Sequence, residues 1–174
     1  MIIVNLFGVP SAGKSTGAAY IFSKLKMLGI NAEMVTEFAK DKVWEQSAEV
    51  FNNQLYILGK QSFKISKLKN KVEVIITDSP LPLSIFYNND PVLGEVFDQL
   101  VLNVFNSYEN VNYLLLRDKP YNSNGRFQTE LESNALAEPM KNLLINNGIA
   151  YKEKKGNETD YDEIVKEIYN SLKK

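Results

Sequence analysis

Gly8-Val9-Pro10-Ser11-Ala12-Gly13-Lys14-Ser15-Thr16 is the stretch of this sequence that decides its fold. The nonapeptide has the pattern G-x-x-x-x-G-K-[ST], which is typical of a glycine-rich loop whose backbone N–H groups hold phosphate. The apolar run before it, Ile2 to Phe7, suits a buried strand, and the segment after it, Ala18 to Leu25, suits a helix. Because the motif requires a strand, a loop and a helix in this order, the sequence predicts a nucleoside triphosphate site here.

The chemistry of phosphate binding explains the residue types in the loop. Gly8 and Gly13 permit backbone conformations that a side chain would block, so the chain can close around phosphate at the positive end of the next helix. We expect the Lys14 ammonium to contact the β and γ phosphates, the Ser15 hydroxyl to bind Mg²⁺, and the Thr16 hydroxyl to donate to the α phosphate. The predicted ATP-binding residues of the loop are Gly8, Ser11, Ala12, Gly13, Lys14, Ser15 and Thr16.

The composition limits the classes of protein and of chemistry. A chain of 174 residues is long enough for a core, and we expect residues 1–174 to form one domain. A net charge of −1 argues against a strongly basic nucleic-acid binder but leaves a local basic patch open. Because cysteine and histidine are absent, we expect no zinc site, and a general base would be a carboxylate or else a lysine or tyrosine. With no signal-peptide pattern and no apolar run approaching about 18 residues, we expect a cytoplasmic protein with no membrane partner.

Strand-like and helix-like segments alternate along the rest of the chain. The predicted strands are 2–7, 32–36, 72–77, 111–116 and one that starts at 149–151. Alternation of this kind gives a parallel sheet with right-handed crossovers. The predicted fold class is therefore α/β: the three-layer P-loop NTPase fold, with a five-stranded parallel sheet, helices on both faces and a lid loop.

Caps and apolar faces locate the first three helices. We expect the first helix to end near Leu28 with Gly29 as its C-terminal cap, and a long second helix to begin at Ser47. The predicted apolar face of the second helix is Phe51, Leu55, Leu58 and Ile65. A third helix is predicted to open at Pro91. Its predicted core face is Val92, Val96, Leu100, Val101, Val104 and Phe105.

Two more helices are expected in the last third of the chain. Thr129 and Glu132 have the spacing of a capping box, and the helix that they open is predicted to end at Gly148. The last helix is predicted to begin near Thr159 or Asp160.

Charged residues follow three of the predicted strands directly. In a parallel sheet, ligands bind at the carboxyl ends of the strands, which is where Glu37, Asp78 and Arg117 stand. Asp78 would hold Mg²⁺, or else be a turn residue. Glu37 would take the proton of an acceptor hydroxyl, or else be a surface carboxylate. We expect Glu37 beside the glycine loop, because the first and second strands end at the same edge.

Arg117 and Arg126 are the only arginines, and they bracket a polar segment that is predicted to be a lid at about 118–129. The planar fork of arginine binds phosphate oxygens in pairs. We therefore expect both guanidinium groups, with Lys119 as an additional cation, to close over the triphosphate, neutralise charge in the transition state and exclude water. The alternative is a plain surface loop.

Lysines crowd the C-terminal half of the second predicted helix, at positions 60, 64, 67, 69 and 71. Our preferred interpretation is a solvated face that suits the negative end of the helix dipole. The other interpretation is a contact with nucleic acid.

Four segments together resemble a known group of proteins. They are the loop 8–16, Thr36-Glu37-Phe38-Ala39-Lys40, Thr77-Asp78-Ser79-Pro80, and Arg117-Asp118-Lys119-Pro120-Tyr121-Asn122 through Gly125-Arg126-Phe127-Gln128-Thr129-Glu130. In these segments the chain is similar to small phage-type P-loop kinases of the ribosylnicotinamide kinase and deoxynucleoside kinase group. The resemblance implies ATP and Mg²⁺ as cofactors, Glu37 as base, and Arg117 and Arg126 as lid arginines on phosphate. The arginine of the Asp-Arg-Ser sequence that deoxynucleoside kinases carry after the third strand is missing here.

Three functions are compatible with these residues. The first is transfer of the γ-phosphate of ATP to a nucleoside, a nucleotide or a modified base, with Lys14, Glu37, Asp78, Arg117 and Arg126 as candidate catalytic residues. The second, which the resemblance permits, is a kinase for hydroxymethyluracil within DNA. The third is a regulatory NTPase without an acceptor, although the absence of an Asn-Lys-x-Asp motif counts against a guanine-specific switch.

We expect Lys14→Ala to abolish turnover and leave the fold intact, because the charge of this lysine is needed only when triphosphate is bound. Thermal melting with and without Mg-ATP checks this, since the parent should be stabilised by the ligand and the variant should not. Full activity in the variant would contradict the assignment of the phosphate loop.

Overall fold

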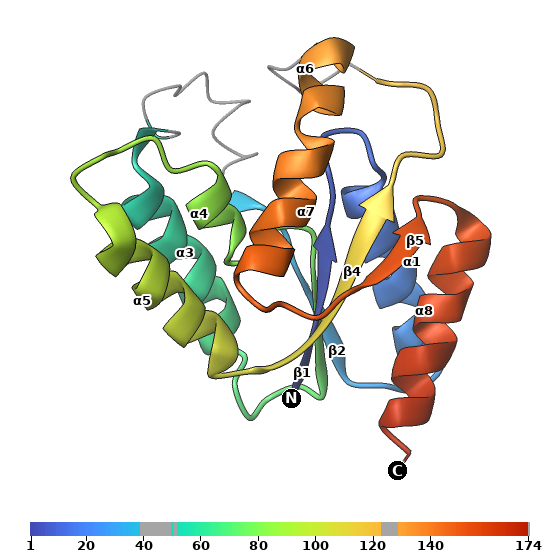
Figure 1. The fold of residues 1–174 in the computed structure, drawn as a ribbon. Coiled ribbons are helices and arrows are strands. Elements are labelled where there is room, and N and C mark those ends of the chain that lie inside the picture. The colour runs from blue at the N-terminus through green and yellow to red at the C-terminus, as the bar shows by residue number, and fades with distance from the viewer. Residues whose placement is uncertain (39–49, 51, 123–128, 174) are drawn as a thin grey trace.

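The computed structural model describes residues 1–38, 50, 52–122 and 129–173, and its centre is a five-stranded sheet (Figure 1). The strands are β1 (Ile2–Phe7), β2 (Ala32–Val35), β3 (Val74–Thr77), β4 (Glu109–Leu116) and β5 (Lys152–Lys155). They pair in the order β2-β3-β1-β4-β5, and every pairing is parallel. The predicted five-stranded parallel sheet is thus confirmed.

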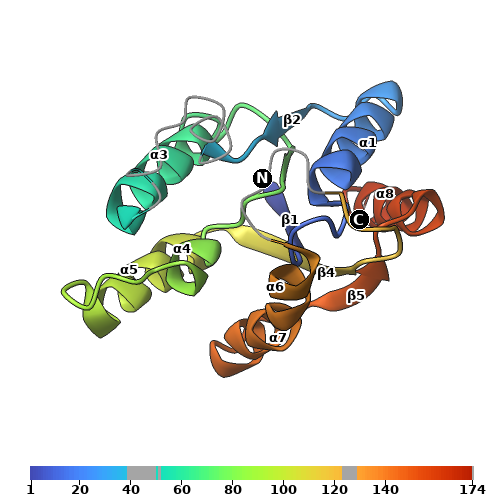
Figure 2. The same cartoon turned by 90° about the horizontal axis from the view of Figure 1, so that it is seen from above.

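Helices cover both faces of the sheet and make three layers, as Figure 2 shows from above. On one face lie α1 (Lys14–Met27) and α8 (Glu158–Ser171), and on the other lie α3 (Gln54–Ser66), α5 (Gly94–Asn106) and α7 (Ala137–Asn146). Alternate residues of the buried strand β1 supply the two cores: Val4 and Leu6 pack with α1 and α8, and Ile3 and Phe7 pack with α3, α5 and α7.

The fifth strand begins later than the apolar run 149–151 predicted. Ala150 does not pair in the strand ladder; its carbonyl oxygen accepts a hydrogen bond of 2.9 Å from the Asn112 side chain. The Asn112 side-chain oxygen accepts in turn from buried Asn5, also at 2.9 Å. Because side chains satisfy this turn, the ladder with β4 starts only at the pair Tyr113 and Lys152.

The long second helix begins at Gln54 and is capped by Asn53, whose side chain accepts from the N–H of Tyr56 at 2.9 Å. The predicted cap Ser47 and the predicted core residue Phe51 lie outside the described residues. Leu58 and Ile65 are buried as expected, and Ile57 is buried beside them. Leu55 was wrongly placed in the core: it lies one residue beyond Gln54 on the outer side of the helix and is half exposed.

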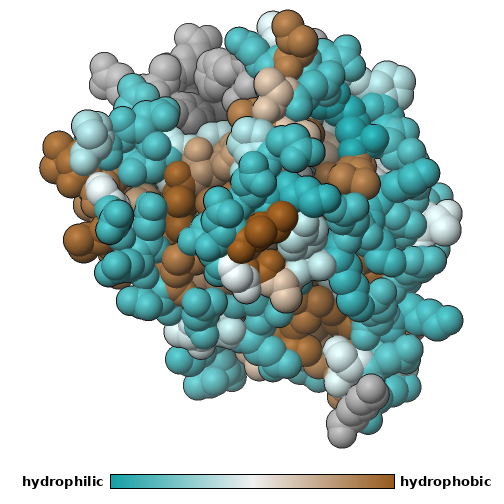
Figure 3. All heavy atoms as spheres, in the orientation of Figure 1, coloured by the Kyte–Doolittle hydropathy of each residue, from teal (hydrophilic) through white to brown (hydrophobic). Residues whose placement is uncertain are grey.

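The third predicted helix, α5, begins at Gly94, so Pro91 does not open it. Phe97, Val101 and Phe105, which are spaced four residues apart, form its buried face. This spacing turns Val96 and Leu100 outward, and Val92 precedes the helix. The core prediction is therefore wrong for these three residues, which are exposed at 78, 46 and 88%. In Figure 3 apolar residues are visible at the margin of the molecule over this helix. Of the remaining predicted core residues, Val104 is partly buried in the same core.

The helix predicted from Thr129 to Gly148 is two helices, α6 (Glu130–Ala135) and α7, which join at Leu136. The predicted capping box is confirmed: the N–H of Glu132 is bonded to the Thr129 hydroxyl, and the Glu132 carboxylate to the N–H of Thr129. A short helix, α4 (Leu83–Phe86), follows the proline turn after β3. The last helix begins at Glu158, slightly earlier than predicted, because Asn157 caps it. Within the described ranges, none of the helices has the length and apolar character needed to cross a membrane.

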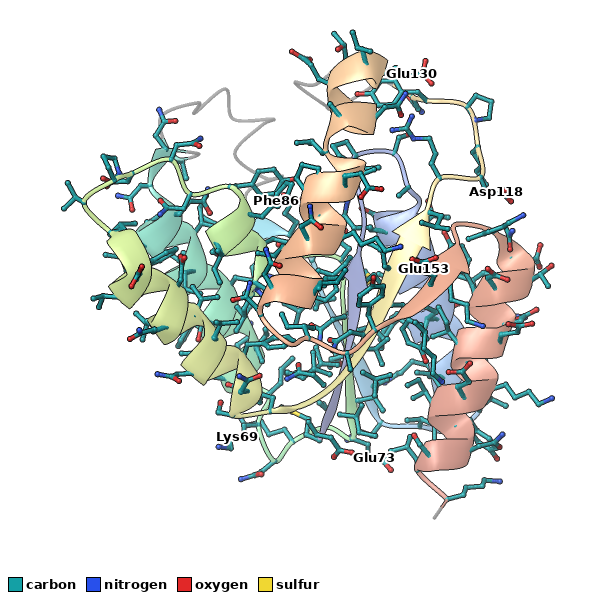
Figure 4. The ribbon with its side chains drawn as sticks, in the orientation of Figure 1. Lys69, Glu73, Phe86, Asp118, Glu130 and Glu153 are labelled. Carbon is teal, nitrogen blue, oxygen red and sulfur yellow. The ribbon has the colours of Figure 1, made fainter. Side chains whose placement is uncertain are left out.

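The outer strand β5 is rich in lysine and is protected by ion pairs. The Nζ atoms of Lys152 and Lys154 pair with Glu167 on α8 at 2.7 and 3.7 Å, and the buried Tyr113 hydroxyl donates to the same carboxylate at 2.9 Å. Figure 4 shows this lysine-rich strand, with Glu153 labelled, beside α8. Charged side chains on an edge strand hinder pairing with a second chain.

This ion cluster makes stability depend on pH. Burial raises the pKa of Glu167, but hydrogen bonds from Lys152 and Tyr113 and the charges of the two lysines outweigh it, so the pKa is lowered. A lowered pKa in the folded state stabilises the protein fully above the ordinary glutamate pKa, and this stabilisation is lost as the pH falls through the folded pKa.

We expect the difference in free energy of unfolding between the parent and Glu167→Gln to shrink on acidification. Urea unfolding of both proteins at several pH values measures this difference. A difference that stays constant with pH would contradict this account.

Candidate active site

The glycine loop connects β1 to α1 and needs its glycines for both conformation and space. Gly8 and Gly13 have φ angles of 143° and 94°, and Ser11 between them is also left-handed at 66°. A Cβ at Gly8 would lie 2.7 Å from the Leu115 carbonyl oxygen, and one at Gly13 would lie 2.4 Å from the Tyr161 hydroxyl. A side chain at either position would therefore displace the loop from β4 or α8.

Lys14 stands at the first residue of α1 and folds back across the loop. Its Nζ donates to the carbonyl oxygens of Gly8 at 2.7 Å and of Val9 at 3.2 Å. These acceptors are neutral, whereas phosphate oxygens carry charge and form stronger hydrogen bonds with an ammonium group. The side chain is thus held at the loop in a position where a triphosphate would compete for it. Ser15 and Thr16 follow on the exposed first turn of the helix.

Asp78 directly follows β3, the strand that pairs with β1 through Thr77 and Asn5. Its side chain is only 4% exposed, and its Oδ1 accepts a hydrogen bond of 3.1 Å from the N–H of Glu37. The sequence predicts Glu37 directly beside the glycine loop. In the structure β3 lies between β2 and β1, so Glu37 adjoins Asp78 instead. The two carboxylate residues predicted from different strand ends therefore belong to one structural unit.

Gln61 of α3, which the sequence analysis did not single out, holds this unit in place. Its side chain is 2% exposed, and its Oε1 accepts from the N–H of Phe38 at 3.2 Å. Its Nε2 donates to the carbonyl oxygen of Ser79 at 3.2 Å and is 3.4 Å from the Thr77 hydroxyl. The amide therefore ties the segment after β2 to the turn after β3. The only sequence signal is a polar residue between Leu58 and Ile65 on an apolar helix face.

Aromatic side chains lie at the same end of the sheet. Phe86 and Tyr87 at the end of α4 pack edge to face with ring centroids 4.9 Å apart, and Phe38 packs on Tyr56 of α3 at 5.6 Å. Figure 4 shows Phe86 between α4 and α7. Burial and the nearby negative charge of Glu37 raise the pKa of Tyr87 to about 12, so its hydroxyl stays protonated. The sequence signal that could have pointed to Phe86 and Tyr87 is an aromatic pair shortly after the proline turn.

The predicted row of lysines extends from α3 into the residues after it, and its members lie in different places. Lys64 donates from Nζ to the carbonyl oxygen of Thr36 at 3.2 Å and lies 5.7 Å from the Phe38 ring centre, while Lys60 lies 5.4 Å from that of Tyr56. Lys69 lies at the opposite end of the sheet, as Figure 4 shows. Lys60 and Lys64 therefore bring positive charge to the aromatic residues next to Glu37. Lys69 does not share this surface with them.

Arg117 contacts the glycine loop and α6. One guanidinium nitrogen donates to the carbonyl oxygen of Pro10 at 3.2 Å and to the Ser133 hydroxyl, and the other donates to the Asn134 side chain at 2.8 Å. The guanidinium group also lies over the Tyr121 ring, 5.1 Å from its centre. Arg126 and the other residues of 123–128, half of the predicted lid, lie outside the described residues, so the expected pair of arginines over phosphate remains a prediction.

Serine, aspartate and a triphosphate form an oxygen donor set that suits Mg²⁺. The Ser15 hydroxyl lies in the first turn after the loop, and Asp78 lies at the end of the strand next to β1. Among the described residues no three acidic, histidine or cysteine side chains form a metal cluster. Mg²⁺ that binds together with phosphates needs only one or two protein ligands, so these residues fit the ion.

Comparison with solved structures places the fold. Thymidylate kinase from Ehrlichia chaffeensis superposes with a TM-score of 0.63 over 98% of this chain and 98% of that chain, at 14% sequence identity. The chain therefore has the fold of a P-loop kinase, with the glycine loop, Asp78 and Glu37 at the carboxyl end of its sheet. No family model and no curated protein matches the sequence.

The contacts of Arg117 predict a contribution to the unliganded fold. Arg117→Ala removes hydrogen bonds that tie α6 to the loop, and we expect it to lower the free energy of unfolding by about 2 kcal/mol, in the range of hydrogen bonds from charged groups. Urea unfolding without nucleotide measures this, with Lys119→Ala at an exposed position as the control. Equal stability of both variants would mean that Arg117 acts on ligands alone.

Proposed function

We propose that this protein transfers the γ-phosphate of ATP to a hydroxyl or phosphate of a nucleoside, nucleotide or modified base. The observation that carries the proposal is the direct contact of the Glu37 backbone with Asp78, beside the strand that leads into a complete phosphate loop. The residue proposed as base and the residue proposed to hold the metal are thus neighbours. The likeness to a kinase fold agrees with this arrangement.

The glycine loop would bind the triphosphate through its backbone N–H groups at the positive end of α1. Lys14 would leave the carbonyl oxygens of Gly8 and Val9 and contact the β and γ phosphates. Ser15 and Asp78 would hold Mg²⁺, which supplies positive charge for the phosphoryl group in flight. Each of these groups stabilises charge, which is the main requirement of phosphoryl transfer.

Glu37 would take the proton of the acceptor hydroxyl. Its backbone is fixed by Asp78, and the following N–H of Phe38 is fixed by Gln61, so the position of the half-buried side chain is restricted. Tyr87 does not compete as a base, because its raised pKa keeps its hydroxyl protonated at neutral pH. If Glu37 is not the base, Asp78 is the next carboxylate in the same unit.

The residues around Glu37 favour an acceptor with a base and a phosphate. Phe38, Tyr56 and Phe86 offer aromatic rings of the kind on which nucleobases stack. Lys60 and Lys64 stand at the same place and would attract phosphate. We therefore favour a nucleotide over a free nucleoside. The same two lysines would serve a modified base within DNA, which is the second candidate.

Transfer from γ-labelled ATP to nucleosides, nucleoside monophosphates and duplex DNA that contains hydroxymethyluracil tests these acceptors directly. Phosphorylated monophosphate supports the first candidate. Labelled DNA, with transfer that falls steeply as salt rises, supports the second. Hydrolysis without a labelled acceptor would leave the regulatory NTPase and overturn the kinase proposal.

We expect Glu37→Gln to lower phosphate transfer roughly 10²–10⁴-fold, the usual range for a lost general base, and to leave ATP affinity nearly unchanged. Glutamine keeps the size and the backbone contact with Asp78 but accepts no proton. Transfer rates and ATP binding, measured separately, check this.

Two further variants make the result specific. Glu33→Gln, at an exposed position in β2, should behave as the parent. Asp78→Asn should raise the Mg²⁺ concentration needed for half-maximal rate, which Glu37→Gln should not do. Transfer at the parent rate by Glu37→Gln would exclude Glu37 as the base.

A further inference from the structure

Two carbonyl groups of the phosphate loop accept hydrogen bonds from side chains far outside the motif. The Tyr161 hydroxyl on α8 donates to the Gly13 carbonyl oxygen at 2.9 Å. The Ser133 hydroxyl on α6 donates to the Pro10 carbonyl oxygen, also at 2.9 Å, beside the bond from Arg117. Neither Tyr161 nor Ser133 has a role in the phosphotransfer chemistry described above.

The geometry of the peptide bond gives these contacts a consequence. In a trans peptide the carbonyl of one residue and the N–H of the next lie in one plane and point in opposite directions, and none of the described peptides is cis. The Gly13 carbonyl oxygen also accepts the first hydrogen bond of α1, from the N–H of Gly17 at 2.8 Å. Together with the bond from the Tyr161 hydroxyl, this bond fixes the direction of the Gly13 carbonyl and so turns the N–H of Lys14 to the opposite side. The Pro10 carbonyl fixes the N–H of Ser11 in the same way.

Tyr161 is fitted closely to the loop. It is 2% exposed, and a Cβ at Gly17 would lie 2.6 Å from its ring, just as one at Gly13 would lie 2.4 Å from its hydroxyl. Its ring also packs on Tyr20 of α1, with centroids 5.8 Å apart. Burial raises the pKa of Tyr161 to about 12, so the hydroxyl remains a donor at any physiological pH. The hydroxyl has little freedom to leave the Gly13 carbonyl.

We propose that Tyr161 is a positioning residue of the phosphate loop: by donating to the Gly13 carbonyl oxygen, its hydroxyl helps to orient the Lys14 N–H toward bound triphosphate. Ser133 does the same for the Ser11 N–H through Pro10. The inference rests on the proposed function, since it assumes that the loop binds a triphosphate.

The test compares Tyr161→Phe with Tyr113→Phe, its matched control. Tyr161 of α8 and Tyr113 of β4 are buried in the same core, and each hydroxyl donates one hydrogen bond, but that of Tyr113 goes to Glu167, away from the loop. Binding of ATP and of inorganic triphosphate is measured for both, together with the KM values for ATP and for the acceptor and the free energy of unfolding.

We expect Tyr161→Phe to bind ATP and inorganic triphosphate roughly three- to tenfold more weakly, the effect of one lost hydrogen bond. The KM for ATP should rise by a similar factor, and the KM for the acceptor should stay at the parent value. Tyr113→Phe should lose comparable stability and keep the parent affinity, which separates positioning from general support of the core.

Gly17→Ala is a second test of the same contact, in which the Tyr161 hydroxyl is retained. Alanine is favourable in a helix, so its main effect should be the push of the new Cβ against the Tyr161 ring. We expect it to weaken triphosphate binding as Tyr161→Phe does. Parent-like affinity in both variants, or an equal loss in Tyr113→Phe, would overturn this inference alone. A parent that binds neither ATP nor triphosphate would overturn the proposed function as well.

Discussion

The left-handed backbone of the glycine loop is the constraint on which the rest of the structure depends. With φ above zero at Gly8, Ser11 and Gly13, the loop turns sharply, and neighbouring elements approach it closely at its glycines. The Leu115 carbonyl of β4 approaches Gly8, and Gly156, just before α8, lies so close that a Cβ there would be 2.1 Å from the Ala12 carbonyl oxygen. Segments from the whole second half of the chain are therefore built around nine residues near its start.

Arg117 has a structural role at the loop that its sequence position did not indicate. From the sequence it was a phosphate ligand, since arginine is rare in this chain and stands at the end of a strand. In the structure its guanidinium group connects the Pro10 carbonyl with Ser133 and Asn134. A guanidinium group has five N–H donors in a fixed fork, so it can bridge a backbone carbonyl and two side chains at once. Arg117 thereby links α6 to the loop, whatever further contact it makes with nucleotide.

The proposed acceptor side is held differently, by the Gln61 amide and the Asp78 carboxylate and not by the loop. Gln61 and Asp78 each bind a backbone N–H of the Glu37–Phe38 segment, and both are almost fully buried. Buried polar groups that are satisfied in this way fix one conformation, since breaking the bonds would leave them unpaired in the core. The triphosphate end and the acceptor end of the proposed site are thus held by separate sets of contacts, which meet at the adjacent strands β1 and β3.

The sequence alone determined the features that depend on local chemistry. The glycine loop, the alternation of strands and helices, the parallel sheet and the capping box of Thr129 and Glu132 follow from short patterns whose residues interact with their own neighbours. The carboxyl ends of the strands were predictable too, which is why Glu37 and Asp78 could be named as candidates before any contact between them was known.

The tertiary structure alone decided which face of a helix is buried and which distant groups meet. Val92, Val96 and Leu100 are as apolar as the core residues of α5, and only packing against the sheet chose Phe97, Val101 and Phe105. Strand order, which put Asp78 between Glu37 and the loop, depends on long connections that leave no local pattern. The roles of Gln61 and Tyr161 come from hydrogen bonds between segments remote in sequence, whose donors and acceptors are common residue types at ordinary positions.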